Sequence, residues 1–446
     1  MKWFRILGFL VAVVVCPKVP AQTATITWTT THQTIDGFGV SDAFQGSAMT
    51  SANADTLFST STGAGLSLLR TGVPSNCSDS TGNCSTVNSG CAGNNKGDMA
   101  LAVARGAKIW STAFTPPALM KTNASCTNGG SLLSGSYEPY ATWLTNYVTS
   151  VQTYAGITPY AVSVTNEPDQ HVSYDSAVWT AQNIHDFVLN DLGPSFSAAG
   201  LTTKIMLPEA SCANLLASYA NTTMEDPAAA AYVGIVADHD YCNKQVSYAT
   251  GGKPEWQTEL SDISGGPFDP SIATAVGWAQ RIHNDMTLGV SAWHYWTWHS
   301  RNPNQQLIDI STGAVSKTLY IMGQWSRFVR PGWLRIDATA NPANEVYVTA
   351  FKETTSGDFA IVVVNRNSAP LNVEFSLAGF PSVTSVTPTL TSASSDLEDQ
   401  ANVNISDDAF SYSLPAASVV TFHGSIASSN TSKVPAAPTS LAATVN

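Results

Sequence analysis

The chain has 446 residues, of which 43% are hydrophobic and only 12% are charged, and its net charge is −12 at pH 7. A hydrophobic fraction of this size can build a large core and excludes global disorder. The negative charge argues against nucleic acid, whose phosphates require clustered Lys and Arg, and against anionic membrane surfaces. Because the chain is too long for one small domain, we expect a barrel-sized domain plus an accessory module.

The first residues have the pattern of an export signal. Lys2 and Arg5 form a basic start, residues 6–15 form an apolar run, and small residues then precede a cleavage site after Ala21. The apolar run is too short to cross a bilayer as a helix. We therefore expect residues 1–21 to be a signal peptide and the protein to be secreted.

Export would place the cysteines in an oxidising compartment, where an even number favours disulfide bonds. Six of the seven cysteines remain after the expected cleavage. Among the fifteen pairings that six cysteines allow, we expect bridges that tie down the loop from Cys77 to Cys126 and a separate Cys212–Cys242 pair. The first three cysteines are spaced more widely than the C-x₂₋₄-C pairs of zinc sites, so we expect no metal and no cofactor.

Residues 35–328 alternate short apolar runs with amphipathic segments, which is the pattern of a parallel sheet wrapped by helices. Eight such runs predict a closed (β/α)8 TIM barrel, because an open sheet of that size would be less usual. The expected strands are residues 35–40, 65–70, 107–113, 160–165, 204–208, 232–239, 254–258 and 290–296, and expected helices include residues 137–154, 176–192 and 273–288.

An antiparallel β-sandwich is expected over residues 329–424, where short runs rich in Val, Thr and Phe recur with turn residues between them. The expected strands are residues 345–351, 359–365, 371–377, 383–390 and 418–422. Residues 22–34 also alternate like a strand and are expected to join this side domain. Residues 425–446 form a Ser/Ala/Pro-rich linker, whose end resembles the first strand of a fibronectin type III domain.

Two expected barrel strands end in a glutamate. The fourth run ends in Asn166-Glu167-Pro168 and the seventh in Gln257-Thr258-Glu259. A Glu at a strand end is often only a salt-bridge partner, but catalytic groups of a barrel collect at the carboxyl ends of its strands. Glycosidic cleavage with retention needs two carboxylates about 5–5.5 Å apart. We predict Glu167 as the acid/base and Glu259 as the nucleophile.

Neighbouring residues support these two roles. Asn166 can hold the 2-hydroxyl of a sugar, and Arg70 and Tyr241 are candidate donors that keep Glu259 charged. That charge is expected to raise the pKa of Glu167. Glu209, at the end of the fifth strand, is a competing carboxylate without an Asn-Pro frame, and we assign it a supporting role.

Aromatic residues are expected to line the cleft as stacking platforms for sugar rings. About half of the side chains in residues 293–298 should instead pack under the helices, because neighbours along a strand point to opposite faces. His239 and His294 are interpreted as hydrogen-bonding residues and not as acids or bases. The predicted substrate-binding residues are Asn166, Arg70, Trp110, Phe114, His239, Tyr241, Trp256, Trp293, Tyr295, Trp296, Trp298 and Arg301.

These residues resemble glycoside hydrolase family 30, in its xylanase-containing branches. The resemblance covers about residues 33–422 and implies a barrel fused to a side β-sandwich, retention of configuration and no metal. It assigns the acid/base role to Glu167 and the nucleophile role to Glu259. The motifs that carry it are Thr34-Ile-Asp-Gly-Phe-Gly, Leu69-Arg70-Thr, Phe114-Thr-Pro-Pro-Ala-Leu-Met-Lys, Val164-Thr-Asn-Glu-Pro-Asp, Asp238-His-Asp-Tyr241, Trp256-Gln-Thr-Glu259 and Trp325-Ser-Arg-Phe-Val-Arg-Pro-Gly.

The residues around the predicted site depart from one branch of that family. Its glucuronoxylan-specific members read a methylglucuronate branch with an arginine shortly after the eighth strand and with tyrosines just beyond the nucleophile. Here Glu259 is followed by Leu-Ser-Asp-Ile-Ser-Gly-Gly, and the arginine, Arg301, is displaced. Because a guanidinium contact depends on position, we predict a hydrolase of the β-1,4-xylan backbone of plant cell walls that does not require glucuronate.

Other functions stay open at this point. Other branches of the family cleave β-1,6-glucan or β-1,6-galactan. A different class, a non-catalytic carbohydrate-binding or cell-wall adhesion protein, would be marked by loss of either catalytic glutamate, and both are present. Nothing in the sequence demands more than a monomer.

Overall fold

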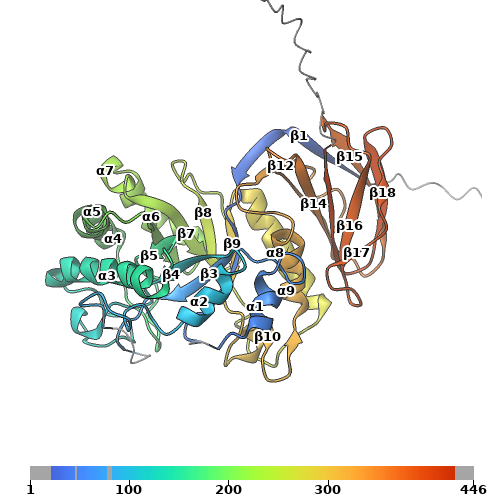
Figure 1. Cartoon of the computed structure of the whole chain (residues 1–446). Coiled ribbons are helices and arrows are strands. Elements are labelled where there is room, and N and C mark those ends of the chain that lie inside the picture. Colours follow the sequence, from blue (N-terminus) through green and yellow to red (C-terminus); the bar gives the residue numbers. More distant parts are fainter. Residues whose placement is uncertain (1–21, 46–47, 78–82, 427–446) are drawn as a thin grey trace, which may run out of the picture.

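A computed structural model describes residues 22–45, 48–77 and 83–426. It contains a closed barrel and, beside it, a β-rich domain built mainly from the C-terminal part of the chain (Figure 1). The predicted signal peptide and almost all of the predicted linker lie outside the described residues. Within the described residues, no helix combines the length and the apolar character that crossing a membrane would require.

Eight parallel strands close the barrel in chain order, and the first strand pairs with the last. Each strand overlaps one of the eight apolar runs of the sequence, so the predicted (β/α)8 fold is confirmed. The strands are β2 (Gly37–Ser41), β3 (Leu68–Gly72), β4 (Lys108–Thr112), β5 (Ala161–Ser163), β6 (Lys204–Ala210), β7 (Val233–His239), β8 (Glu255–Glu259) and β9 (Ala292–Tyr295).

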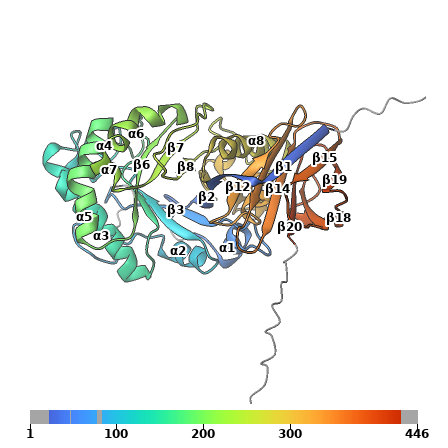
Figure 2. The same ribbon diagram turned by 90° about the horizontal axis from the view of Figure 1, so that it is seen from above.

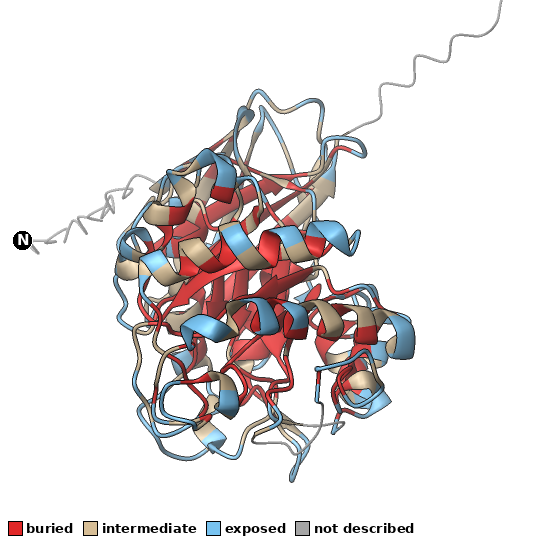
Figure 3. Ribbon diagram, turned by 90° about the vertical axis from the view of Figure 1, so that its left-hand side faces the viewer, coloured by how far each residue is buried: buried red, intermediate tan, exposed pale blue. Residues whose placement is uncertain are grey.

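Helices surround the barrel and turn their apolar faces inward, so that the strands form a buried centre (Figure 3). Local capping sets their ends. The helix expected from residue 176 begins only at Ala181, because the Thr180 hydroxyl caps it by accepting the Asn183 N–H. The helices are α1 (Ser51–Phe58), α2 (Lys96–Val103), α3 (Tyr137–Ala155), α4 (Ala181–Phe187) with the π-helical turn Val188–Leu192, α5 (Gly193–Ala198), α6 (Leu216–Met224), α7 (Pro227–Ala230), α8 (Ile272–Leu288) and α9 (Lys317–Ser326).

The side domain is one hydrogen-bonded sheet that folds into two layers around a core containing Phe375, Phe410 and Phe422. The sequence reading missed β12 and β19. The strands are β1 (Gln22–Thr34), β12 (Leu334–Ala338), β13 (Val346–Lys352), β14 (Asp358–Asn365), β15 (Leu371–Ala378), β16 (Ser385–Thr391), β17 (Glu398–Asp399), β18 (Val403–Asn404), β19 (Ala409–Leu414) and β20 (Ser418–Ser425), and a separate hairpin joins β10 (Ile308–Asp309) to β11 (Ala314–Val315).

The N-terminal strand β1 lies inside this sheet and not at its edge. It pairs antiparallel with β12 and parallel with β15, so the blue strand crosses the orange and red strands in Figure 2. Its side chains Ala24 and Ile26 are buried in the sandwich core. The two ends of the described chain therefore build one domain.

Helices α8 and α9 lie between the barrel and the side domain, and polar contacts fix them there. The Gln280 amide donates to the Tyr347 hydroxyl at 2.7 Å, and the Trp325 indole donates to Thr349 Oγ1 at 3.1 Å. Gln324 binds Thr391 and Thr421 on neighbouring strands. These contacts attach the side domain directly to the helical layer of the barrel.

Three disulfides fasten loops at the mouth of the barrel. The structure pairs Cys77 with Cys126, Cys84 with Cys91, and Cys212 with Cys242. The first two pairs hold the loops that follow β3 and β4. The third joins the loops that follow β6 and β7.

Candidate active site

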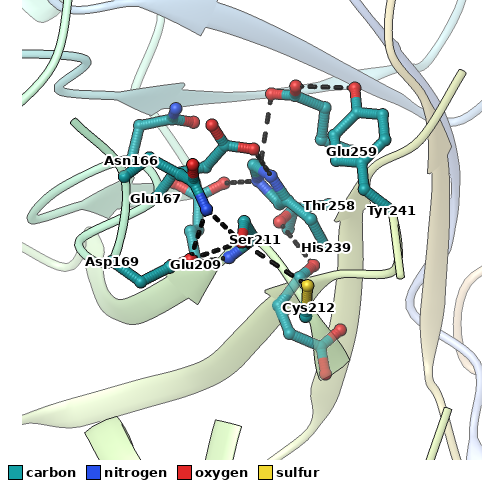
Figure 4. A network of polar contacts seen from close by, with 12 residues as sticks. Asn166, Glu167, Asp169, Glu209, Ser211, Cys212, His239, Tyr241, Thr258 and Glu259 are labelled. Atoms are coloured by element: carbon teal, nitrogen blue, oxygen red, sulfur yellow. Dashed lines mark hydrogen bonds and ion pairs between the residues drawn. The ribbon is translucent and has the colours of Figure 1, made fainter. Parts of the chain in front are cut away.

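Two glutamates face each other at the mouth of the barrel. Glu167 follows β5, and Glu259 is the last residue of β8. Each is only 7% exposed. One oxygen from each carboxylate and one ring nitrogen of His239 all lie within 4.8 Å of one another (Figure 4). The predicted pair is therefore placed together in one buried polar site.

The backbone at Glu167 is in an uncommon conformation. Its φ is +44°, in the left-handed region, although a proline follows it. The Glu167 N–H donates to the backbone oxygen of Glu209 at 2.9 Å, which helps to hold this turn. Strained residues of this kind persist where surrounding structure fixes them, and they cluster at functional sites.

Two donors hold Glu259. The Arg70 guanidinium donates to one carboxylate oxygen, and the Tyr241 hydroxyl donates to the other at 2.9 Å. Arg70 is fully buried in the middle of β3 and also donates to the Asn166 side-chain oxygen at 2.6 Å. These donors hold both oxygens of the Glu259 carboxylate in one orientation.

Glu167 is placed differently. Burial raises its pKa, and the charges of Glu259 and Asp169 raise it further, against a hydrogen bond from His239 Nδ1 at 3.0 Å. A raised pKa favours the protonated form of the Glu167 carboxyl. The two glutamates therefore lie in different environments.

His239 is fully buried and lies next to the carboxylates of the site. Burial lowers its pKa, but the charges of Glu259 and Glu167 and its hydrogen bonds raise it to about 10. Its Nδ1–H donates to Glu167, and Nε2 lies 3.6 Å from a Glu209 oxygen and 3.8 Å from a Glu259 oxygen. His239 thus holds Glu167 by a hydrogen bond and lies close to Glu209 and Glu259 without bonding to them.

Glu209 is the third carboxylate of the site and is fully buried at 0% exposure. Burial raises its pKa, but the Arg70 charge and the His239 contact lower it to about 2. Arg70 Nη2 lies 3.1 Å from it, and Thr112 Oγ1 donates to it at 2.9 Å. Glu209 supports the cations and does not face the opening, in line with the supporting role assigned to it.

The trio of Glu167, His239 and Glu259 also has the spacing of a metal site. A metal ion would need neutral His239 as a ligand and would be repelled by the Arg70 guanidinium that already holds Glu259. These contacts suit a proton-transfer site better than a metal centre.

Phe114 and Trp296 are the predicted aromatic residues at the opening that cover Arg70. Their ring centroids lie 4.9 and 5.5 Å from the Arg70 guanidinium carbon. Both line a cavity of about 380 Å³ at the mouth, together with Phe44 and the predicted Arg301. This cavity continues the site outward along the loops after β2, β3 and β9.

Five predicted cleft residues do not reach the opening, and the structure corrects these assignments. Each is almost fully buried, and each donor nitrogen of the four tryptophans has an internal partner. Trp110 and Trp256 point into the barrel interior below its mouth, whereas Trp293 and Tyr295 point outward and pack against helix α8. The five residues are Trp110 (bonded to His294), Trp256 (to Asp36), Trp293 (to Asp285), Trp298 (to Asp42) and Tyr295, which packs edge-on against Trp278.

The sequence reading missed Tyr174, in the loop after Glu167. Its side chain is 59% exposed, and partial burial together with the charges of Glu167 and Glu259 raises its pKa to about 12. The available signal was its position in the loop directly after a catalytic strand, where barrel sites gather their side chains.

Comparisons with known proteins agree with this geometry. The family model described as the glycosyl hydrolase family 30 TIM-barrel domain matches residues 97–253, and the one described as the family 30 beta sandwich domain matches residues 334–422. The glucuronoxylanase XynC of Bacillus subtilis strain 168 is 32% identical over 337 residues, which are 72% of this chain and 75% of that protein.

Solved structures of family 30 enzymes match the fold of nearly the whole chain. The family 30 subfamily 8 xylanase Xyn30A of Clostridium acetobutylicum is 32% identical, with a TM-score of 0.82 over 91% of this chain and 100% of that one. A family 30 endoxylanase of Clostridium papyrosolvens C71 is 27% identical, with a TM-score of 0.76 over 90% of this chain and 100% of that one.

Proposed function

The chain belongs to glycosyl hydrolase family 30 and is a xylanase-like glycoside hydrolase, and from this we propose that it is a secreted, retaining enzyme that cleaves the β-1,4-xylan backbone. The observation that carries the proposal is the pair of carboxylate oxygens within 4.8 Å of each other. Retaining enzymes hold their carboxyl groups about 5–5.5 Å apart, whereas inverting enzymes leave about 6.5–9.5 Å for a water molecule.

The first step of the proposed reaction forms a covalent glycosyl-enzyme. A Glu259 oxygen attacks the anomeric carbon as the glycosidic bond breaks, and Glu167 gives its proton to the departing oxygen. The Asn166 amide, whose oxygen is held by Arg70, is oriented to bind the sugar 2-hydroxyl, a contact that strengthens in the transition state of such enzymes.

The second step hydrolyses this intermediate. Glu259 is now an ester and carries no charge, so the repulsion that raised the pKa of Glu167 is gone. Glu167 can take a proton from water as that water attacks the anomeric carbon, and Glu259 leaves as a carboxylate. Both groups return to their starting states, and the sugar keeps its configuration.

The xylanase relatives support xylan as the substrate. The segment after the nucleophile supports independence from a charged branch, because residues 260–266 contain no tyrosine. Arg301 lines the cavity with an exposed side chain, next to Ser300 and Asn302. We propose that cleavage does not require a glucuronate branch.

One experiment tests activity, stereochemistry and substrate together. Purified protein is given linear xylan, glucuronoxylan and β-1,6-glucan, and released reducing sugar and the first-formed anomer are followed by NMR. We expect β-anomeric products from both xylans. An α-anomer would contradict retention, cleavage of β-1,6-glucan alone would contradict the substrate, and cleavage of glucuronoxylan alone would contradict branch independence.

The catalytic assignment is checked with a matched pair of variants. Glu259→Ala should abolish sugar release from every substrate while xylan binding stays measurable. Glu225→Ala removes an exposed glutamate at the end of α6 and should change nothing. Sugar release by Glu259→Ala would remove it from the role of nucleophile.

Secretion is proposed from the pattern of residues 1–21. Expression of the full sequence in a secreting host should deliver protein to the medium, and N-terminal sequencing should begin at Gln22. Retention of an intact Met1 terminus inside the cell would contradict it.

A further inference from the structure

A second hollow lies beside the barrel mouth, against helix α8 and the loops that follow β7 and β8. Its volume is about 360 Å³. We call it the α8 groove. Apart from one tryptophan its lining is mainly polar, and it is defined by Asn243, Asp262, Thr274, Trp278, Arg281 and Asn284.

The tryptophan of the α8 groove is fixed before any ligand arrives. Tyr295 meets the Trp278 ring edge-on at 5.6 Å, and the Arg281 guanidinium lies over it at 5.7 Å. Trp278 remains partly exposed. A rigid aromatic ring offers a large contact area at little cost in conformational entropy.

Arg281 is also held in place, by a buried aspartate. Its Nη2 donates to the buried Asp240 carboxylate at 2.5 Å and to the Asp240 backbone oxygen. Its Nε–H is buried and has no hydrogen-bond partner within the part of the chain that the structure describes. A ligand in the groove cannot reach this atom, but the Arg281 side chain as a whole stays 21% exposed and lines the groove.

The rest of the α8 groove has free space, and a disulfide holds one of its loops in place. A Cβ placed on Gly277, beside Trp278, would meet no atom within 4 Å. Asn243 follows Cys242, whose disulfide ties this loop to the loop after β6. A site that needs little ordering loses less free energy on binding.

We propose that the α8 groove is a second carbohydrate-binding site, which holds a neutral stretch of xylan chain apart from the cleft. The proposal rests on the proposed function. Sugar hydroxyls both donate and accept hydrogen bonds, which suits the amide, carboxylate and guanidinium groups of this lining. Arg281 is paired with Asp240, so the groove lining offers no unpaired cation to an acidic ligand, which favours an uncharged one.

The α8 groove and the cavity of the active site share a wall. The Asn304 amide donates to the Asp262 backbone oxygen at 2.7 Å, and Asn302 and Gln305 on either side of Asn304 line the cavity. A polymer bound in the groove would therefore raise the local concentration of its neighbouring segments at the cleft. Short oligosaccharides would gain nothing from it.

The test fills the groove without removing a contact. Gly277→Gln places a side chain in the open space, and Ala273→Gln, on an exposed position of the same helix outside the lining, is the matched control. In an inactive Glu259→Gln background, calorimetric titration with linear xylohexaose should find two sites in the parent and in the control. It should find one site in Gly277→Gln.

The same substitutions in the active protein give a second readout. Gly277→Gln should lower the hydrolysis of insoluble xylan about twofold to tenfold, because avidity is lost, while kcat/KM for xylotetraose stays unchanged. Asn284→Ala, which trims an exposed polar group of the lining, should weaken the second site without any risk to packing. Two sites persisting in Gly277→Gln, or one site in the parent, would overturn the proposal, whereas failure of the wild type to hydrolyse xylan would overturn the proposed function instead.

Discussion

Charge balance around Arg70 and His239 explains how one glutamate can switch roles. In the proposed cycle, Arg70 and His239 balance the carboxylates of Glu209 and Glu259, and Glu167, whose pKa burial raises, is the acid that keeps its proton. When Glu259 becomes an ester, the balance is restored if Glu167 ionises. Buried charges are tolerated only when compensated, so the site has the same net charge at both stages of the proposed cycle.

Removing the Glu209 charge should disturb that balance. In Glu209→Gln the site keeps both cations, so the pKa of Glu167 should fall and the alkaline limb of the kcat/KM profile should move to lower pH. The free energy of unfolding should fall by about 3–5 kcal/mol, because a buried pair is broken. The measurements are a pH–rate profile and denaturant unfolding.

Glu374→Gln, on a partly exposed position of β15, is the control for this change and should leave both quantities unaltered. An alkaline limb that stays in place in Glu209→Gln would mean that the Glu209 charge does not reach Glu167.

At the scale of the elements, a disulfide and a backbone hydrogen bond join the loops that follow β6 and β7. Cys212–Cys242 closes 30 residues, and the Tyr241 N–H donates to the Ser211 oxygen at 3.3 Å. Removing the bridge with Cys212→Ala and Cys242→Ala should lower the free energy of unfolding by about 3–4 kcal/mol. The kcat should fall as well, because Tyr241 holds the nucleophile.

The Cys84–Cys91 pair provides the comparison, since it closes only 7 residues. Its removal should cost about 2.5 kcal/mol and should leave kcat nearly unchanged. Equal losses of kcat in the two double variants, measured on the same xylan, would show that the loss is not transmitted through Tyr241.

Strand positions and the meeting of Glu167 and Glu259 at the barrel mouth could be predicted from the sequence, while depth within the barrel could not. Short apolar runs mark every barrel strand, and Asn166-Glu167-Pro168 and Glu259 stand at strand ends. Trp256 lies only three residues before Glu259 but binds Asp36 inside the barrel. Strands β12 and β19 were not predicted, because Arg335 and Asp337 in β12 and the serines of β19 interrupt their apolar pattern.

At the scale of the whole molecule, the shifted pKa values of two buried groups make the free energy of unfolding depend on pH in opposite directions. Burial raises the pKa of Glu255 to about 8, above the usual value near 4.3 for an unfolded chain. The folded form therefore binds this proton more tightly, and its contribution to stability is lost as pH rises toward 8. Burial and the Arg335 charge lower the pKa of His283 to about 4, so its contribution is lost as pH falls below about 6.5.

Replacing either group should reduce the pH dependence of the free energy of unfolding, on the alkaline side for Glu255 and on the acidic side for His283. Glu255→Gln should make the free energy of unfolding less dependent on pH between about 5 and 8, and His283→Gln should do the same between about 4 and 6.5. Urea unfolding across pH checks both. A Glu255→Gln variant with an unaltered alkaline slope would assign that slope to Asp238 and Asp285, whose pKa values burial also raises.

The place of β1 has a consequence for the order in which the protein is made. Its partners β12 and β15 lie beyond the entire barrel in the chain. A growing polypeptide therefore presents β1 before the barrel and must leave its hydrogen-bonding edges open until β12 and β15 have been synthesised. The barrel can assemble from neighbours as they emerge, but the side domain can close only after the whole barrel has been made. A chain stopped within the barrel would carry an unpaired strand that invites association with other chains.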